Sequence, residues 1–203
     1  ISNKNCFNNY DQLIESNLVD AVYIATLNNT HLDLIKKCAK FKKHILCEKP
    51  ATINKTELEE IKKIIPNSDI IFLEGIAFRS HPLVSEFVKL LNENKFDDII
   101  SIEANFGFNT KKINPKSRLY DKDLGGGAIL DVGCYPIAII NLINNLIDKN
   151  NEITFSKVEG NICKTGVDDY SSAELIISKG IKCNIKAAIK KNIPILLEKP
   201  ISK

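Results

Sequence analysis

The chain has 203 residues, of which 44% are hydrophobic and 26% charged, and its formal net charge is +3. This composition is typical of a globular protein with one large domain or two small ones, and it excludes a disordered or collagen-like chain. The basic residues are nearly all lysines scattered among acidic residues, whereas nucleic-acid-binding proteins gather Lys and Arg on one face, so we expect no nucleic-acid partner.

No stretch of about 18 apolar residues is present, so we expect no membrane partner. The six cysteines form no Cys-x-x-Cys pair and no His lies at zinc-ligand spacing from them, which predicts a reduced, cytoplasmic protein without a metal site. Residue 1 is Ile and the chain contains no Met, so we expect that the sequence lacks the start of its open reading frame.

The first part of the chain alternates apolar runs with amphipathic segments. Helical periodicity predicts three helices, over residues 10–17, 31–41 and 54–65. Apolar runs predict three strands, over residues 19–26, 44–47 and 69–74, and the first of them reads as buried on both faces. Because strands and helices alternate with short connections, we predict βαβ units and a parallel sheet, which is half of a doubly wound domain.

The pattern changes after about residue 78. Two helices are predicted, over residues 81–92 and 128–147, with a polar loop over residues 109–124 between them. Four strands are predicted, over residues 99–108, 153–162, 169–178 and 181–189, with a tight hairpin at Gly180. The predicted fold is therefore α/β: a partial Rossmann-like parallel sheet in residues 1–78, followed in residues 79–203 by an α+β domain with a mainly antiparallel sheet.

Lys49 is the first candidate for chemistry. It follows the strand predicted over residues 44–47, in the sequence Glu48-Lys49-Pro50. Open α/β sheets bind ligands beyond the carboxyl ends of their strands, and a lysine held in a cleft can serve as a general acid or base. A surface lysine after a strand is the alternative that its position alone leaves open.

Asp131 and Tyr135 are the second candidates. They lie four residues apart on the helix predicted over residues 128–147, so their side chains leave one face. A carboxylate at an apolar helix start needs a partner, and Lys49 is an available one. The Tyr135 hydroxyl could donate to a substrate oxygen. A helix-start Asp and a packed Tyr are the alternative readings.

Polar residues also gather where the first predicted strand gives way to a helix, at Thr26, Asn28 and His31. Helix N-termini favour anions such as a dinucleotide pyrophosphate, and these side chains could bond a ribose or an amide. Asn28 as a simple helix cap is the alternative. The run Gly125-Gly126-Gly127 follows a loop rather than a strand, so it is not a dinucleotide-binding Gly-x-Gly-x-x-Gly sequence.

Four segments together resemble the Gfo/Idh/MocA family of nicotinamide-dependent oxidoreductases. The segments are Val19–His31, the Lys-Pro signature His44–Pro50, the crossing Glu74–Pro82 and the helix start Gly125–Pro136. They occur in the family's order and at plausible separations, and the resemblance covers roughly residues 7–190.

The resemblance implies an oxidoreductase that transfers a hydride between NAD or NADP and a sugar, polyol or related diol. Lys49 would be its acid/base, with Asp131 and Tyr135 orienting the substrate and tuning that lysine. The residues implied in cofactor binding are Thr26, Asn28, His31, Glu48 and Lys49. Many relatives carry His where Tyr135 stands; Tyr resembles the branch that includes glucose–fructose oxidoreductase and dihydrodiol dehydrogenase, which favours NADP.

Two departures from the family qualify that expectation. The family's opening strand and Gly-x-Gly-x-x-Gly are not found, and residues 194–203 do not resemble its next strands, so we expect a chain truncated at both ends that binds cofactor poorly by itself. Family members commonly pair through the open face of the second-domain sheet, which implies a homo-oligomeric parent. The alternatives are a non-enzymatic, dinucleotide-binding regulatory protein of the same fold and an inactive gene fragment.

Overall fold

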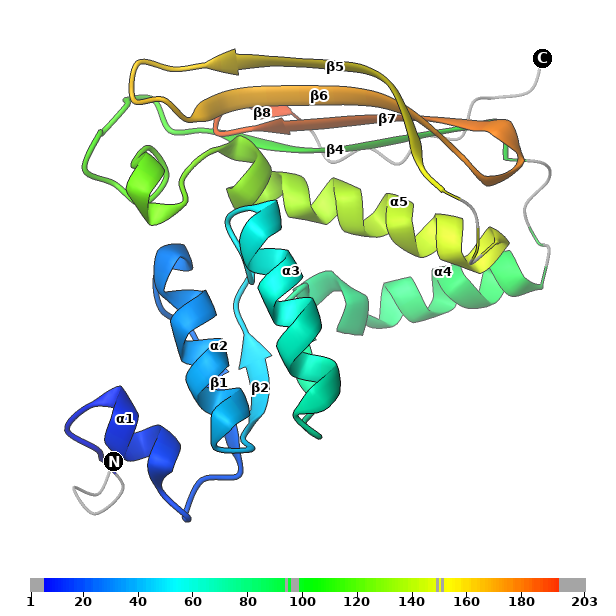
Figure 1. The fold of residues 1–203 in the computed structure, drawn as a ribbon. Helices are drawn as coiled ribbons and strands as arrows, with labels where there is room; N and C mark the ends of the chain where they lie inside the picture. Colours follow the sequence, from blue (N-terminus) through cyan, green and yellow to red (C-terminus); the bar gives the residue numbers. More distant parts are fainter. Residues whose placement is uncertain (1–5, 94, 96–98, 149, 151, 194–203) are drawn as a thin grey trace. The chain divides into compact units, whose positions relative to one another are not determined.

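The computed structural model describes residues 6–93, 95, 99–148, 150 and 152–193. The chain divides into two compact units, Ile1–Gly75 and Ile76–Lys203, called here the N-terminal and C-terminal units (Figure 1). The sequence analysis placed the change of pattern three residues later, at residue 78. The second Glu-Lys-Pro of the chain, at Lys199, lies outside the described residues.

The N-terminal unit contains a parallel three-stranded sheet in the order β1-β2-β3. Its strands are β1 (Ala21–Ile24), β2 (His44–Cys47) and β3 (Phe72–Glu74). Its helices are α1 (Tyr10–Glu15), α2 (His31–Lys40) and α3 (Lys55–Ile64), with short 3-10 turns η2 (Asn28–Thr30) and η3 (Ile65–Asn67). Strands and helices alternate as the sequence predicted, which confirms the partial Rossmann-like sheet.

Helices α1 and α3 begin at asparagine caps. The Asn54 side chain accepts a hydrogen bond from the Glu57 amide at 2.9 Å, and the Glu57 carboxylate accepts one from the Ile53 amide at 3.0 Å. This reciprocal pair satisfies amide groups that a helix start otherwise leaves unbonded, and it places the start of α3 where the sequence predicted a helix, at residue 54.

Only one face of the N-terminal sheet is buried. Ile24 of β1 and Ile45 and Cys47 of β2 join a core with residues of α2 and α3 that includes Ile35 and Ile61. Their neighbours on the other face are exposed, namely Tyr23, Leu46 and Leu73. The expectation that the first strand is buried on both faces is therefore wrong, because the buried side chains of α2 and α3 pack on a single face.

The C-terminal unit contains a five-stranded sheet in the order β5-β6-β7-β4-β8. Its strands are β4 (Ser101–Asn109), β5 (Thr154–Ile162), β6 (Asp168–Ile177), β7 (Ile181–Ala188) and β8 (Lys190–Ile193). The pair β4 and β7 is parallel, and the other three pairs are antiparallel, as expected for a mainly antiparallel sheet. Strand β8 was not predicted from the sequence; it pairs with β4 and extends the sheet past residue 189.

The other elements of this unit are helices and helical turns. They are η4 (Ala77–Ser80), α4 (Pro82–Asn92), η5 (Lys122–Leu124), the π-helical turn η6 (Ile129–Gly133), α5 (Cys134–Ile147) and η7 (Ser178–Gly180). Helix α5 runs along one face of the sheet, where Ile140 and Ile143 pack with Leu175 and Cys183 (Figure 1). Strand β5, at the end of the sheet order, is exposed along its whole length.

One helical stretch, Lys122–Ile147, is long and apolar enough to cross a membrane by length and composition alone, a feature that the search for an uninterrupted apolar run did not register. The core helix of a globular domain passes the same test. The burial of Ile140 and Ile143 against the sheet makes α5 the core helix of the C-terminal unit.

Replacing Ile140 with Ala tests this assignment. Ile140 is 1% exposed, so Ile140→Ala should leave a cavity and lower the free energy of unfolding by about 2–5 kcal/mol. The matched control is Ile137→Ala on the same helix, where the side chain is 46% exposed and the loss should stay below about 1 kcal/mol. Urea unfolding followed by circular dichroism measures both, and equal losses would contradict the packing of α5.

The buried cysteines generate a second prediction. Burial raises the pKa of the Cys47 thiol to about 12 and those of Cys38 and Cys183 to about 11. At about pH 8 a thiol with the ordinary pKa is ionised to roughly a tenth, but Cys47 only to about 10⁻⁴, so the native protein should not be alkylated there. Iodoacetamide labelling read by mass spectrometry should modify the exposed Cys6 first, and Cys47 only after denaturation.

Candidate functional site

Two groups of predicted site residues lie in the two units, and the first surrounds Lys49. Strands β1 and β2 are parallel and pair Ile24 with Cys47, so both strands end at the same edge of the sheet. Thr26 and Lys49 each follow their strand by two residues at that edge. This is the edge at which open α/β sheets bind their ligands, and the Lys49 side chain there is half-buried.

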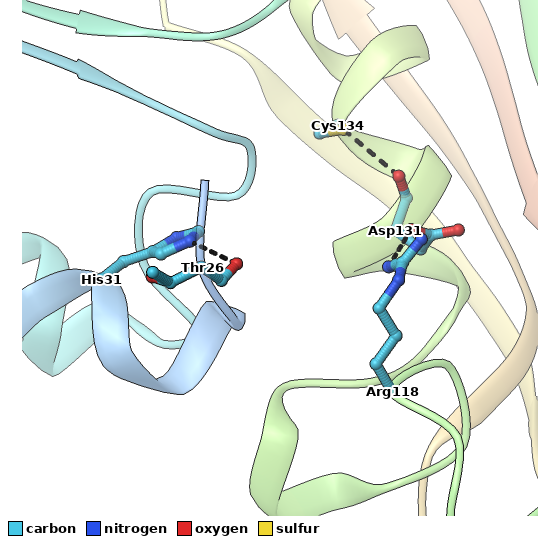
Figure 2. Close-up of polar contacts among 5 residues, drawn as sticks. All are labelled: Thr26, His31, Arg118, Asp131 and Cys134. Carbon is cyan, nitrogen blue, oxygen red and sulfur yellow. Dashed lines mark hydrogen bonds and ion pairs between the residues drawn. The ribbon is translucent and has the colours of Figure 1, made fainter. Parts of the chain in front are cut away.

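His31 ties these two strand ends together. Its side chain is fully buried, with Nδ1 2.9 Å from the Pro50 carbonyl oxygen and Nε2 3.2 Å from the Thr26 carbonyl oxygen (Figure 2). Both ring nitrogens therefore face backbone oxygens of the protein itself. The contact of His31 with a cofactor stays a prediction; in the structure the ring lies between the turn after β1 and the segment after β2.

The segment after β2 is also held from β3. The Ala51 amide donates to Glu74 Oε1 at 2.8 Å, while His31 holds the preceding Pro50 carbonyl. The Lys49–Pro50 peptide is cis. The backbone immediately after Lys49 is therefore fixed by contacts from α2 and β3. The sequence analysis missed Glu74, whose only signal was an acidic residue at the carboxyl end of a predicted strand.

Glu48 accepts a short hydrogen bond from the phenol of Tyr23, a contact that joins β1 to the residue before Lys49. This bond to a carboxylate raises the pKa of Tyr23. Glu48, predicted as a cofactor contact, thereby has a partner on the protein, and its carboxylate is oriented by β1.

The turn between β1 and α2 is ordered by its own side chains. The Thr30 hydroxyl donates to the Leu27 carbonyl at 2.7 Å, so the 2.7 Å contact between Thr26 Oγ1 and Thr30 Oγ1 has Thr26 as its donor. Thr30 is the N-cap of α2 but its side chain makes no capping bond to the helix. A helix start of this kind favours an anion, and Asn28 lies half-buried in the turn that precedes it.

The second group surrounds Asp131 in the C-terminal unit. Asp131 lies in the π-helical turn η6, is 7% exposed, and pairs with Arg118 at 2.9 Å between Nη1 and Oδ1 (Figure 2). Arg118 comes from the loop before η5 and is about half exposed. The sequence analysis considered Lys49 as a partner for Asp131; Arg118 supplies a charged partner within the same unit.

The glycines before this turn bring the Arg118 loop close. The Gly126 and Gly127 amides donate to the carbonyl oxygens of Asp121 and Leu119, each at 2.9 Å. A Cβ on Gly126 would lie 2.7 Å from the Leu119 oxygen, which is closer than real side chains come. The glycine run therefore lets the loop pass close to the helix start, and the buried Tyr120, hydrogen-bonded to the Thr110 hydroxyl, anchors the loop.

Tyr135, in the first turn of α5, is packed between two aromatic rings. Its ring centroid is 5.3 Å from that of Phe106 and 6.3 Å from that of Phe78, both in tilted geometry. Such contacts fix the direction of a phenol ring. Tyr135 is half-buried in the structure.

The sequence predicted one regular helix carrying Asp131 and Tyr135, but the structure shows a π-helical turn followed by an α-helix. Asp131 belongs to a π-helical turn in which the Cys134 amide bonds back to the Ile129 carbonyl, and only Tyr135 lies in the α-helix. The Cys134 thiol also contacts the Asp131 carbonyl oxygen at 3.8 Å (Figure 2). Wide turns of this kind occur often at functional sites, and residue periodicity does not reveal them.

Two family models match the chain and together take in most of it. Residues 2–75 match the oxidoreductase family with an NAD-binding Rossmann fold, and residues 84–192 match the GFO/IDH/MocA C-terminal domain. The two matches correspond to the N-terminal and C-terminal units.

Two curated relatives of the chain are named as dehydrogenases. The chain is 28% identical over 188 residues to a trans-1,2-dihydrobenzene-1,2-diol dehydrogenase of Xenopus tropicalis, covering 93% of this chain and 55% of that protein. It is 27% identical to the D-xylose 1-dehydrogenase (NADP(+)) 2 of Haloferax volcanii, covering 90% of this chain and 54% of that protein. The chain thus spans about half the length of these relatives.

Solved structures show the same fold. KijD10, a 3-ketoreductase from Actinomadura kijaniata determined in complex with NADP and TDP-benzene, superimposes with a TM-score of 0.79 at 24% identity, covering 93% of this chain and 56% of that one. The matching models, the parallel sheet with its Lys49 edge and the second unit with its Asp131 turn lead to one assignment: the chain belongs to the Gfo/Idh/MocA oxidoreductase family.

Proposed function

We propose that the protein carrying this chain is an NAD(P)-dependent oxidoreductase of a sugar, polyol or related diol. One observation carries the proposal: Lys49 stands at the ligand-binding edge of the parallel sheet, on a segment whose backbone is fixed by His31 and Glu74. A structural surface lysine does not need a backbone held from two neighbouring elements, whereas an acid/base group gains from a fixed position.

The residues around that edge fit a nicotinamide dinucleotide. The N-terminus of α2, where the N-cap Thr30 makes no side-chain capping bond, suits a negatively charged pyrophosphate. Asn28, Glu48 and the Thr26 hydroxyl offer polar groups for a ribose or carboxamide. When bound, the nicotinamide supplies the hydride chemistry. We assign Thr26, Asn28, Glu48 and Lys49 to its binding, and favour NADP because a xylose dehydrogenase relative is named for it.

In this proposal Lys49 donates or accepts the proton of the reaction. In reduction its ammonium group donates a proton to the substrate carbonyl oxygen, and in oxidation its neutral amine accepts the hydroxyl proton. A lysine is suited to both directions because only its ammonium and amine forms have to interconvert. We assign this step to Lys49 alone.

Asp131 and Tyr135 orient the substrate in this proposal. The Arg118 guanidinium compensates the buried charge of Asp131, which keeps the carboxylate available to accept a hydrogen bond from a hydroxyl group. The phenol of Tyr135 is held in direction by Phe78 and Phe106, so it can donate to a substrate oxygen without first losing rotational freedom.

We further propose a cytoplasmic homo-oligomer that pairs through the sheet face opposite α5. That face carries Glu103, whose carboxylate accepts from Lys186 Nζ at 2.8 Å and from the Asn105 amide at 2.9 Å. The Lys186 and Glu103 side chains are each more than a third exposed, so the pair lies on accessible surface that a second copy could cover.

Lys49→Ala is the central test, made in the protein expressed from its whole gene. Loss of the acid/base group should lower kcat by about 10²- to 10⁴-fold with NADP and an aldose and diol panel. NADPH binding, followed by the fluorescence of the bound nucleotide, should remain measurable.

The matched control is Lys55→Ala, which removes an exposed lysine at the start of α3 and should leave kcat unchanged. Survival of near wild-type turnover in Lys49→Ala would remove the acid/base assignment. A wild-type protein that binds NADPH but turns over none of the panel would instead favour the second candidate, a dinucleotide-binding regulatory protein.

A further inference from the structure

A carboxylate from β6 holds the first residue of the π-helical turn. Asp168 Oδ2 accepts a hydrogen bond from the Ile129 backbone amide at 2.9 Å and a second from the Ser171 hydroxyl at 2.8 Å. Asp168 is 39 residues from Ile129 in sequence, so this is a tertiary contact between the sheet and the start of the helix. The N-cap of the turn is Ala128, whose methyl side chain cannot accept a hydrogen bond from the Ile129 amide.

The glycine at position 127 is shaped for this carboxylate. Gly127 has a φ of +118°, a conformation that residues with a side chain rarely adopt. A Cβ placed there would lie 2.3 Å from Asp168 Oδ1. Glycine at this position is therefore required both by the backbone conformation and by the close approach of Asp168.

The contact lies two residues before Asp131. The Asp131 amide donates to the Gly127 carbonyl at 3.0 Å, so the backbone that Asp168 fixes at Gly127 and Ile129 also sets the position of Asp131. A carboxylate beside the first amides of a helix is electrostatically favoured, and a charge-assisted bond of this kind is about twice as strong as a neutral one.

We propose that Asp168 is a positioning residue: it holds the π-helical turn against β6 and thereby sets where the Asp131 carboxylate stands. The effect of Asp168 on catalysis rests on the proposed function, whereas its contact with the π-helical turn does not. Asp168 itself contacts neither substrate nor cofactor in this proposal; it acts through the Ile129 amide and Gly127.

The neighbouring residue offers a matched control. Asp169 is also a carboxylate of β6, is 8% exposed, and bonds instead to the Asn161 side chain of β5 at 2.7 Å. Asp169→Ala removes a buried carboxylate from the same strand without touching the helix start. Asp168→Asn is the conservative variant, because its amide oxygen can still accept from the Ile129 amide.

The experiment compares Asp168→Ala, Asp168→Asn and Asp169→Ala in the protein expressed from its whole gene. Asp168→Ala should lower kcat by about 10- to 100-fold, as expected for a displaced catalytic group, with the KM for NADP nearly unchanged. Asp168→Asn should recover most of the loss, and Asp169→Ala should keep kcat within about threefold of wild type at comparable thermal stability loss.

Hydrogen exchange gives the readout that does not need activity. In Asp168→Ala the Ile129 amide loses its acceptor and should exchange at least about tenfold faster, whereas Asp169→Ala should leave its exchange unchanged. Unchanged exchange in Asp168→Ala, or equal kcat losses in both alanine variants, would overturn the positioning role. Absence of any nicotinamide-linked turnover in the wild type would overturn the proposed function instead, and the exchange measurement would still decide whether Asp168 holds the turn.

Discussion

The burial of the His31 ring between two backbone carbonyls is the constraint on which the N-terminal unit depends. Parallel strands bring their carboxyl ends to one edge of the sheet, but pairing alone does not determine where the chain goes after each strand ends. His31 links the end of β1 to the segment after β2, and Glu74 adds a link from β3. A neutral imidazole has a single N–H, so the ring donates to one of the two carbonyl oxygens and packs against the other. The buried ring therefore lies between both segments and limits the path of the backbone around Lys49.

In the C-terminal unit the corresponding constraint is the burial of the Asp131 carboxylate. A helix start rich in apolar residues must hold an acidic side chain away from bulk water, and the structure supplies Arg118 for its charge. The close passage of the Arg118 loop requires glycine at position 126, and the approach of Asp168 requires it at position 127. Sequence features that are weak one by one, a glycine run and a polar loop, thus act as parts of one local structure.

Periodicity predicted the fold well because it reports burial. The alternation of strands and helices, the break near residue 78 and the core helix α5 all follow from which residues face apolar surroundings. Periodicity failed where burial was not the deciding factor. Strand β8 is a short polar segment held by pairing with β4, and the π-helical turn depends on tertiary bonds from a distant strand.

The candidate site divides along the same line. Lys49, Asp131 and Tyr135 were found from local motifs, since their neighbours in sequence mark them. Three residues were not found in this way, namely Glu74, Asp168 and Arg118 as the partner of Asp131. Each contributes through a contact between residues that are distant in sequence or separated by a loop. His31 shows the same limit: its place in the sequence suggested a ligand contact, and its burial between two backbone carbonyls could not be predicted from that place.

Strand β5 bears on how this protein behaves at high concentration. It ends the sheet order, and it exposes three large apolar side chains, Phe155, Val158 and Ile162. A strand of this composition at the end of a sheet is a template on which another chain can add. The exposed ion pair of Lys157 and Glu159 interrupts the apolar run, and charges at such places discourage intermolecular strand pairing. These two charges therefore oppose strand addition at β5, a constraint on the substitutions of this strand that is separate from catalysis.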